Sequence, residues 1–185
     1  MRSTIFLFAI VTIAINACAA EAPVSTANPA GIEPVFDCYQ TNSAWGFTLS
    51  GKVIDSKGTV WSYGKRGQAW LPTRIKQGDA SYLTAKDLLV KFVDAKQISN
   101  IEAKALADNL ALIAAAAEGK VTQADTGTRD AGTSDCHAYI YDAGKQRYRD
   151  IELGSDGGVS DMRYTNAAAE AQTLLTWLKS VGVAN

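Results

Sequence analysis

The sequence has few of the residues from which most metal and cofactor sites are built. It contains one histidine, His137, and three cysteines. Because all three cysteines have another expected use, in an acyl anchor and a disulfide, one histidine is left without a free thiol and a zinc site of the usual His/Cys kind is not expected. The chain also lacks a P-loop, a dinucleotide-binding glycine pattern and a Gly-x-Ser-x-Gly motif, so no cofactor is predicted. Its net charge of −1 gives no reason to expect nucleic acid as a partner.

Long apolar segments are absent too. The longest run, from Ile5 to Ile15, has 11 residues and is broken by Thr12, whereas a membrane-spanning helix needs about 20. The run follows the positive charge of Arg2 and precedes small residues, which is typical of a secretory signal peptide. We therefore expect residues 1–17 to be a signal peptide and the chain to be exported.

The end of this signal carries the most specific motif of the sequence. Ile15-Asn16-Ala17-Cys18 resembles the bacterial lipobox, in which an aliphatic, a variable and a small residue precede a cysteine. The resemblance implies that Cys18 is acylated and anchors the protein to a lipid bilayer. Because Ala19 follows, the resemblance favours the periplasmic side of the outer membrane. Ordinary cleavage after Ala17-Cys18-Ala19 is the alternative, and it would release the protein into the soluble periplasm.

Proline is scarce except just after this motif. Three of the four prolines lie within residues 18–35, among Ala, Ser, Thr and Asn. Such a stretch has little to bury, so we expect a disordered tether there. Residues 36–185 are long enough to form a single globular domain with its own core.

The cysteines that remain beside Cys18 are Cys38 and Cys136. Exported cysteines pair by default, so we expect a disulfide between them, worth about 4–5 kcal/mol in the chain-entropy model. A nucleophilic pair of Cys136 with the adjacent His137 is the alternative. Neighbouring residues on a strand point to opposite faces, which makes the disulfide the better use of Cys136.

The hydrophobic pattern predicts an α+β fold. Alternating residues predict a hairpin over 45–63 and a meander over 137–165, while 64–81 and 120–135 are expected to be loops. Capping boxes at Thr84 and Ser99, and an N-cap at Asn166, predict three helices. The expected architecture is an antiparallel sheet of about five strands with the helices packed mainly on one face.

The loop from residue 64 to 81 is the most suggestive surface in the sequence. It contains Lys65, Arg66, Trp70, Arg74 and Lys76. Trp and Arg are among the residue types that dominate protein-binding hot spots. Because no catalytic motif is present, we expect a non-catalytic envelope lipoprotein that uses this loop to bind or inhibit another envelope protein.

Two other chemistries stay open. Acids in two loops could bind calcium, although they do not fit an EF-hand and Asp is common in turns. These acids are Asp125, Asp130, Asp135, Asp156 and Asp161. Paired carboxylates could instead make the chain a periplasmic hydrolase, which predicts a cleft with two facing acids whose titration is perturbed.

Overall fold

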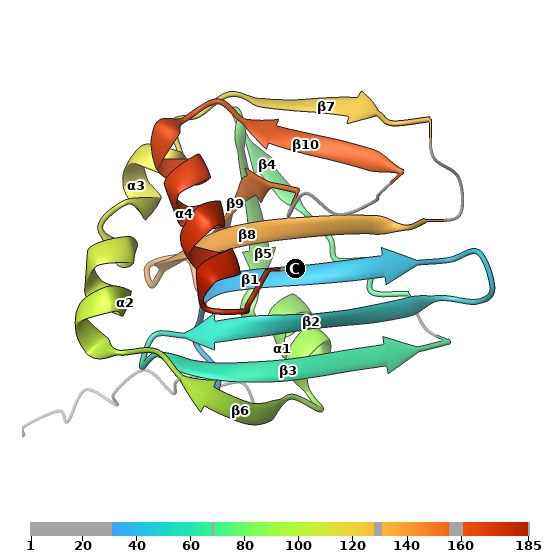
Figure 1. Cartoon of the computed structure of the whole chain (residues 1–185), viewed down its shortest axis with the longest axis horizontal. Helices are drawn as coiled ribbons and strands as arrows, with labels where there is room; N and C mark the ends of the chain where they lie inside the picture. Colours follow the sequence, from blue (N-terminus) through green and yellow to red (C-terminus); the bar gives the residue numbers. More distant parts are fainter. Residues whose placement is uncertain (1–30, 68, 128–130, 156–160, 185) are drawn as a thin grey trace, which may run out of the picture.

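One antiparallel sheet dominates the structure (Figure 1). The computed structural model describes residues 31–67, 69–127, 131–155 and 161–184. Ten strands lie in these ranges: β1 (Pro34–Asn42), β2 (Thr48–Asp55), β3 (Thr59–Arg66), β4 (Ile75–Gln77), β5 (Ala80–Thr84), β6 (Lys96–Asn100), β7 (Val121–Asp125), β8 (Thr133–Asp142), β9 (Arg147–Gly154) and β10 (Met162–Asn166). Four helices accompany them there: α1 (Ala85–Phe92), α2 (Ala103–Leu110), the four-residue α3 (Ile113–Ala116) and α4 (Ala169–Ser180).

The sheet forks at β9. The main strand order is β4-β5-β9-β8-β1-β2-β3-β6, and a second arm made of β10 and β7 also joins β9. One side of β9 pairs with β8. The other side is shared, because Arg147 to Asp150 pair with β5 whereas Gly154 pairs with Thr165 of β10. Two arms therefore diverge from one strand.

The prediction of a five-stranded α+β fold was wrong, since the structure is predominantly β. The missed strands are β1, β4, β5, β6 and β7. The side chains of β4, β6 and β7 are all exposed, so these strands carry no alternation of apolar and polar residues. Successive residues of β1 are buried on both faces, which hides the same signal in a different way.

The central strands present two different faces. Phe36 and Cys38 belong to an apolar core that includes residues of α2, α3 and α4, and Phe36 packs edge-on against Trp177 at 5.2 Å between ring centroids. The opposite face carries Asp37 and Tyr39 and is covered by α1 (Figure 1). Helices therefore lie on both faces, with α2, α3 and α4 on one face and α1 on the other.

The two capping boxes had opposite outcomes. Thr84 caps α1 as predicted, because its hydroxyl accepts the amide hydrogen of Asp87 and the Asp87 carboxylate accepts that of Thr84. Ser99 instead lies in β6, and α2 begins at Ala103 without a side-chain cap. The single long helix predicted here is two short ones.

The ends of the domain also differ from expectation. β1 begins at Pro34, and Ile32 before it is buried, so the ordered fold starts a few residues earlier than residue 36.

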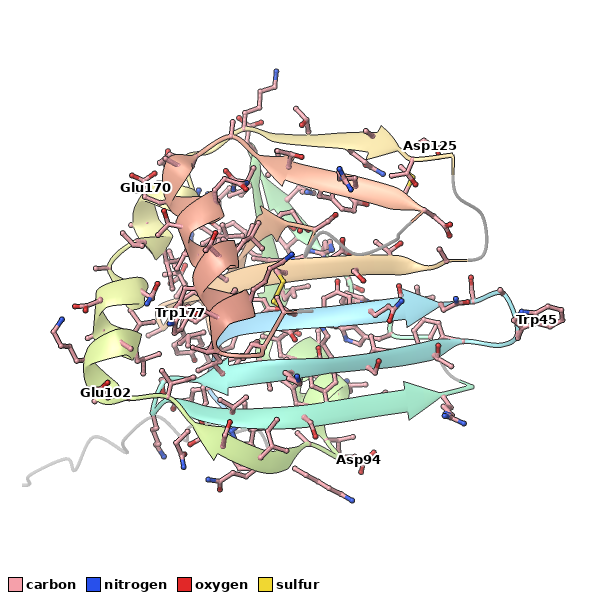
Figure 2. The ribbon with its side chains drawn as sticks, in the orientation of Figure 1. Trp45, Asp94, Glu102, Asp125, Glu170 and Trp177 are labelled. Carbon is pink, nitrogen blue, oxygen red and sulfur yellow. A yellow bond between two sulfur atoms is a disulfide. The ribbon has the colours of Figure 1, made fainter. Side chains whose placement is uncertain are left out.

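Trp45, predicted to lie in a strand, stands 98% exposed at the turn between β1 and β2 (Figure 2). Among the described residues, no helix combines the length and apolar character needed to cross a bilayer.

Candidate functional site

A cleft of about 940 Å³ opens where the sheet forks. This volume suits a small ligand or one unit of a polymer. The β4–β5 hairpin contributes Lys76 and Ser81 to its lining, and residues 116–121, which run from the end of α3 into β7, contribute another part. The lining also includes His137 of β8 and Glu152 of β9.

Strand alternation explains why polar side chains gather here. Asp135, His137 and Tyr139 alternate along β8 with residues of the apolar core, so they share the other face of the sheet. The register of β8 with β9 places His137 opposite Glu152 and Tyr139 opposite Asp150. Side chains from β8 and β9 thereby meet in one buried polar cluster.

The imidazole of His137 is held by hydrogen bonds at both nitrogens. Nδ1 lies 2.7 Å from Oδ1 of Asp150, and Nε2 lies 3.2 Å from the hydroxyl of Tyr39 and 3.3 Å from Oε2 of Glu152. A carboxylate can only accept, so Nδ1 carries the proton and Nε2 presents its lone pair. Burial, together with the positive charges of Lys91 and Arg74, lowers the pKa of His137 well below its usual value. The imidazole is therefore neutral at physiological pH.

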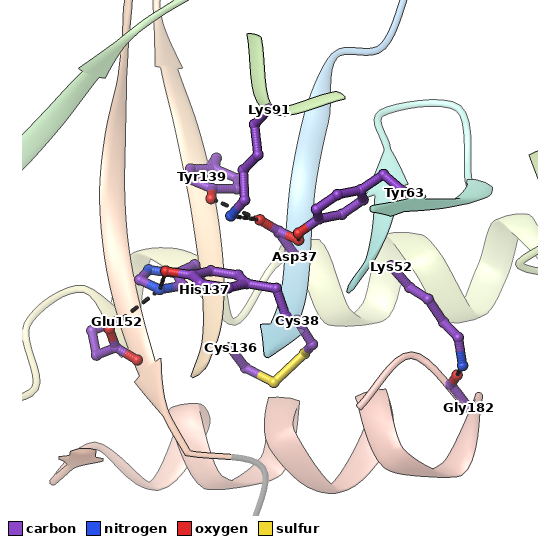
Figure 3. Close-up of a disulfide and its surroundings, with 11 residues drawn as sticks. Asp37, Cys38, Lys52, Tyr63, Lys91, Cys136, His137, Tyr139, Glu152 and Gly182 are labelled. Carbon is purple, nitrogen blue, oxygen red and sulfur yellow. Dashed lines mark hydrogen bonds and ion pairs between the residues drawn. A yellow bond between two sulfur atoms is a disulfide. The ribbon is translucent and has the colours of Figure 1, made fainter. Parts of the chain in front are cut away.

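Glu152 differs from an ordinary glutamate in its protonation state. Burial and the negative charge of Asp135 raise the pKa of Glu152 to about 8. The carboxyl group is thus mostly protonated at neutral pH, and its hydroxyl can donate to Nε2 of His137. With its side chain 20% exposed, Glu152 also remains within reach of the cleft. Figure 3 shows its contact with His137.

Arg74 completes this group by pairing with the second carboxylate. Its guanidinium forms an ion pair with Oδ2 of Asp150, whose side chain is 2% exposed, while Arg74 itself is 35% exposed. The pair compensates a charge that would otherwise be costly to bury. Asp150 is therefore a charged acceptor that orients the imidazole of His137.

A second buried polar cluster lies beside the first, centred on Asp37 (Figure 3). Nζ of Lys91 lies 2.5 Å from Oδ2 of Asp37, and both side chains are 0% exposed. The hydroxyls of Tyr63 and Tyr139 also donate to Asp37. Burial outweighs the Asp37 charge and lowers the pKa of Lys91 to about 8. The position of Gly51 makes room for this cluster, because a Cβ there would stand 2.6 Å from the Tyr63 hydroxyl.

The residues of the suggested binding loop are divided between several environments. Arg74 and Lys76 line the cleft. Trp70 is half-buried, donates from Nε1 to the Asp87 carbonyl at 3.0 Å, and covers the Lys91 ammonium at 4.2 Å from its ring. Lys65 donates to the carbonyl of Val90 in α1, and Arg66 is exposed at the end of β3. The structure does not gather these five side chains into one surface.

The cysteines and the acids of the predicted loops lie partly inside and partly outside the described residues. Cys38 and Cys136 are joined by a disulfide between directly paired positions of β1 and β8, with Cα atoms 4.1 Å apart, while Cys18 lies outside the described residues. Asp130 and Asp156 also lie outside them. Within the described part of the chain, no group of three or more His, Cys, Asp or Glu residues is arranged to hold a metal ion.

The sequence indicated His137 only as a partner for Cys136, and it did not indicate Glu152 or Asp150. A signal was present, because polar residues recur at every second position of β8 from Asp135 to Tyr139, and Asp150 and Glu152 have the same spacing in β9. Such spacing places one polar set on one face, but only the fold shows that this face is buried. No family model matches this chain, and no curated protein or solved structure shows significant similarity to it.

Proposed function

We propose that the chain is a hydrolase of the bacterial envelope and that the cleft at the sheet fork is its active site. The observation that carries the proposal is the contact of one imidazole, His137, with a charged carboxylate on Nδ1 and a protonated carboxyl group near Nε2. Titratable groups driven to opposite protonation states in a cleft are typical of acid–base catalysis.

Each group has a defined role in this hydrolysis. A water molecule in the cleft gives a proton to Nε2 of His137, and its oxygen attacks the carbonyl carbon of an ester or amide. Glu152 gives its proton to the leaving group as the bond breaks. Asp150 stabilises the imidazolium that forms, in the way that a buried carboxylate does in a catalytic triad.

The short distance between the acid, Glu152, and the base, His137, allows both groups to return to their starting state. After bond cleavage His137 carries an extra proton on Nε2, and Glu152 has lost its own. Nε2 of His137 lies 3.3 Å from Oε2 of Glu152, so a single proton transfer between them restores both groups. No additional reactant beyond water is needed.

The test is an assay of the purified protein against nitrophenyl esters, peptide nitroanilides and the amide bonds of peptidoglycan. We expect turnover in one of these classes, and Glu152→Gln and His137→Gln should each lower kcat/KM by about 10²–10⁴-fold. Asp94→Asn changes an exposed acid outside the cleft lining and should have no effect. Equal rates for wild type and both cleft variants in every class would refute the proposal.

A second candidate function is the binding of another envelope protein, for which Trp45 and not Trp70 is the favoured contact. An indole that is 98% exposed at a turn is unusual for a soluble surface. A photo-crosslinking residue at position 45 should give one discrete adduct in the envelope, and one at exposed Lys57 should give none. Identical adduct patterns at both positions would remove this candidate. Anchoring through Cys18 remains a proposal in either case.

A further inference from the structure

A buried ion pair lies directly behind the proposed base. The register of β1 with β8 places Asp37 opposite His137. Lys91 reaches Asp37 from α1, on the side of the sheet that carries His137. The aromatic ring of Tyr39 connects the two, since its centroid lies 3.4 Å from Nζ of Lys91 and 5.5 Å from the centroid of the stacked imidazole.

Stability alone gives a poor reason for a charge in this place. Both members of the pair are 0% exposed, so each loses its hydration on folding. Apolar residues of similar volume are often as stabilising as such a pair, or more so. The rings of Tyr63, Phe92 and Trp70 lie around Nζ and attract its charge through cation–π contacts. The ammonium held in this way acts on the groups beside it, among them His137.

We propose that Lys91 is a positioning residue of the cleft, whose buried ammonium, fixed by Asp37, keeps His137 neutral and its Nε2 unprotonated. This inference rests on the proposed hydrolase function, in which Nε2 is the base. A positive charge near the imidazole disfavours the imidazolium, and it does so strongly where water is excluded. Lys91 is one of two cations that lower the pKa of His137.

The other charges around the imidazole do not replace Lys91. The titratable groups near it are Asp37 and Tyr39 of β1, Asp135 and Tyr139 of β8, Asp150 and Glu152 of β9, Arg74 and Lys91. Arg74 is the other cation, but its side chain is 35% exposed, so water screens its charge more than that of Lys91, which is 0% exposed. Without Lys91, Arg74 would be the one cation left among these groups, and the remaining carboxylates would favour the imidazolium more strongly.

The chain offers a direct readout, because His137 is its only histidine. Nitrogen-15 NMR of the labelled protein reports the tautomer and titration of this one imidazole without assignment. Wild type should show the Nδ1-protonated tautomer and a pKa well below the usual value. Lys91→Met should raise the pKa of His137 by about one unit or more, a tenfold change in the protonation equilibrium. The acidic limb of the pH profile of kcat/KM should move to higher pH together with the pKa of His137.

Matched variants separate charge from packing. Lys91→Arg keeps the charge and should keep the low pKa of His137. Lys52→Met removes a lysine that bonds to the Gly182 carbonyl, away from this cluster, and should leave His137 unchanged (Figure 3). If Lys91→Met does not fold, as judged by near-ultraviolet circular dichroism, Lys91→Gln removes the charge and keeps a hydrogen-bond donor for Asp37. It should raise the pKa of His137 as well.

The outcomes distinguish this inference from the function on which it rests. A folded Lys91→Met or Lys91→Gln protein with an unchanged His137 titration overturns the role of Lys91. It does so even if hydrolysis is found. A raised pKa of His137 in a protein that hydrolyses nothing supports the electrostatic role and refutes the proposed hydrolase.

Discussion

Replacing Glu152 by Gln should change how the stability of the protein depends on pH. In the folded state the pKa of Glu152 is raised to about 8, from an ordinary value of 4.5. The folded protein therefore holds a proton that the unfolded chain has already released above pH 4.5. The stability contributed by protonated Glu152 is complete below pH 4.5 and is lost as the pH rises toward 8. The amide introduced by Glu152→Gln would remain neutral throughout.

The cleanest interval for this effect lies between pH 6.5 and 8. Below 6.5 the single histidine opposes it, because burial holds the folded pKa of His137 well below 6.5 and the unfolded chain takes up the proton. Near pH 8 the buried Lys91 begins to contribute, since its folded pKa is lowered to about 8. Across the 1.5 pH units between these limits, one proton corresponds to about 2 kcal/mol of unfolding free energy.

Urea unfolding at half-unit steps of pH would measure this difference. The free energy of unfolding of wild type should fall by about 2 kcal/mol relative to Glu152→Gln between pH 6.5 and 8. Glu118→Gln, at a side chain that is 77% exposed, serves as the control and should follow wild type. Parallel curves for wild type and Glu152→Gln would show that Glu152 is ionised in the folded protein, and the acid role would fail with it.

Three further outcomes are expected. Gly51→Ala should destabilise the fold by about 1–3 kcal/mol in chemical denaturation, since its Cβ would stand 2.6 Å from the Tyr63 hydroxyl, whereas Gly64→Ala meets nothing closer than 3.4 Å and should be near neutral. Replacing Cys38 and Cys136 together by Ala should cost about 4–5 kcal/mol, because the disulfide spans 98 residues; an unchanged midpoint would contradict this. Intact mass of the protein from envelope fractions should show acylation at Cys18, and an unmodified N-terminus would argue for a soluble form.

The sequence predicted those elements whose pattern is local. The β2–β3 hairpin has alternating residues around an Asp-Ser-Lys-Gly turn, α1 has its capping box, and α4 has an apolar stripe. These features depend only on neighbours within a few residues, so they can be recognised without the fold. The exposed edge strands β6 and β7 bury no face and left no comparable pattern.

The site could not be predicted in the same way, because its partners are distant in sequence. Lys91 and Asp37 are 54 residues apart, and Tyr39 and His137 are 98 apart. The acidity of Glu152 follows from burial and from Asp135, neither of which a spacing reveals. The polar alternation of β8 was visible, but the usual reading of such alternation is a solvent-facing side. Here that side is covered by α1, so the expectation that it faces solvent is wrong.

The alternation of β8 also limits how this protein can change during evolution. Asp135 and His137 line the cleft and Tyr139 binds Asp37 on the same face, while Cys136 and Ala138 between them belong to the core. Inserting or deleting one residue would exchange the two sets, placing His137 among apolar side chains and Cys136 in the cleft. Substitutions along β8 can be tested one at a time by selection, but a single-residue shift loses site, disulfide and core together. Relatives of this protein should therefore vary in length within the β4–β5 and β7–β10 arms and keep the length of β8 constant.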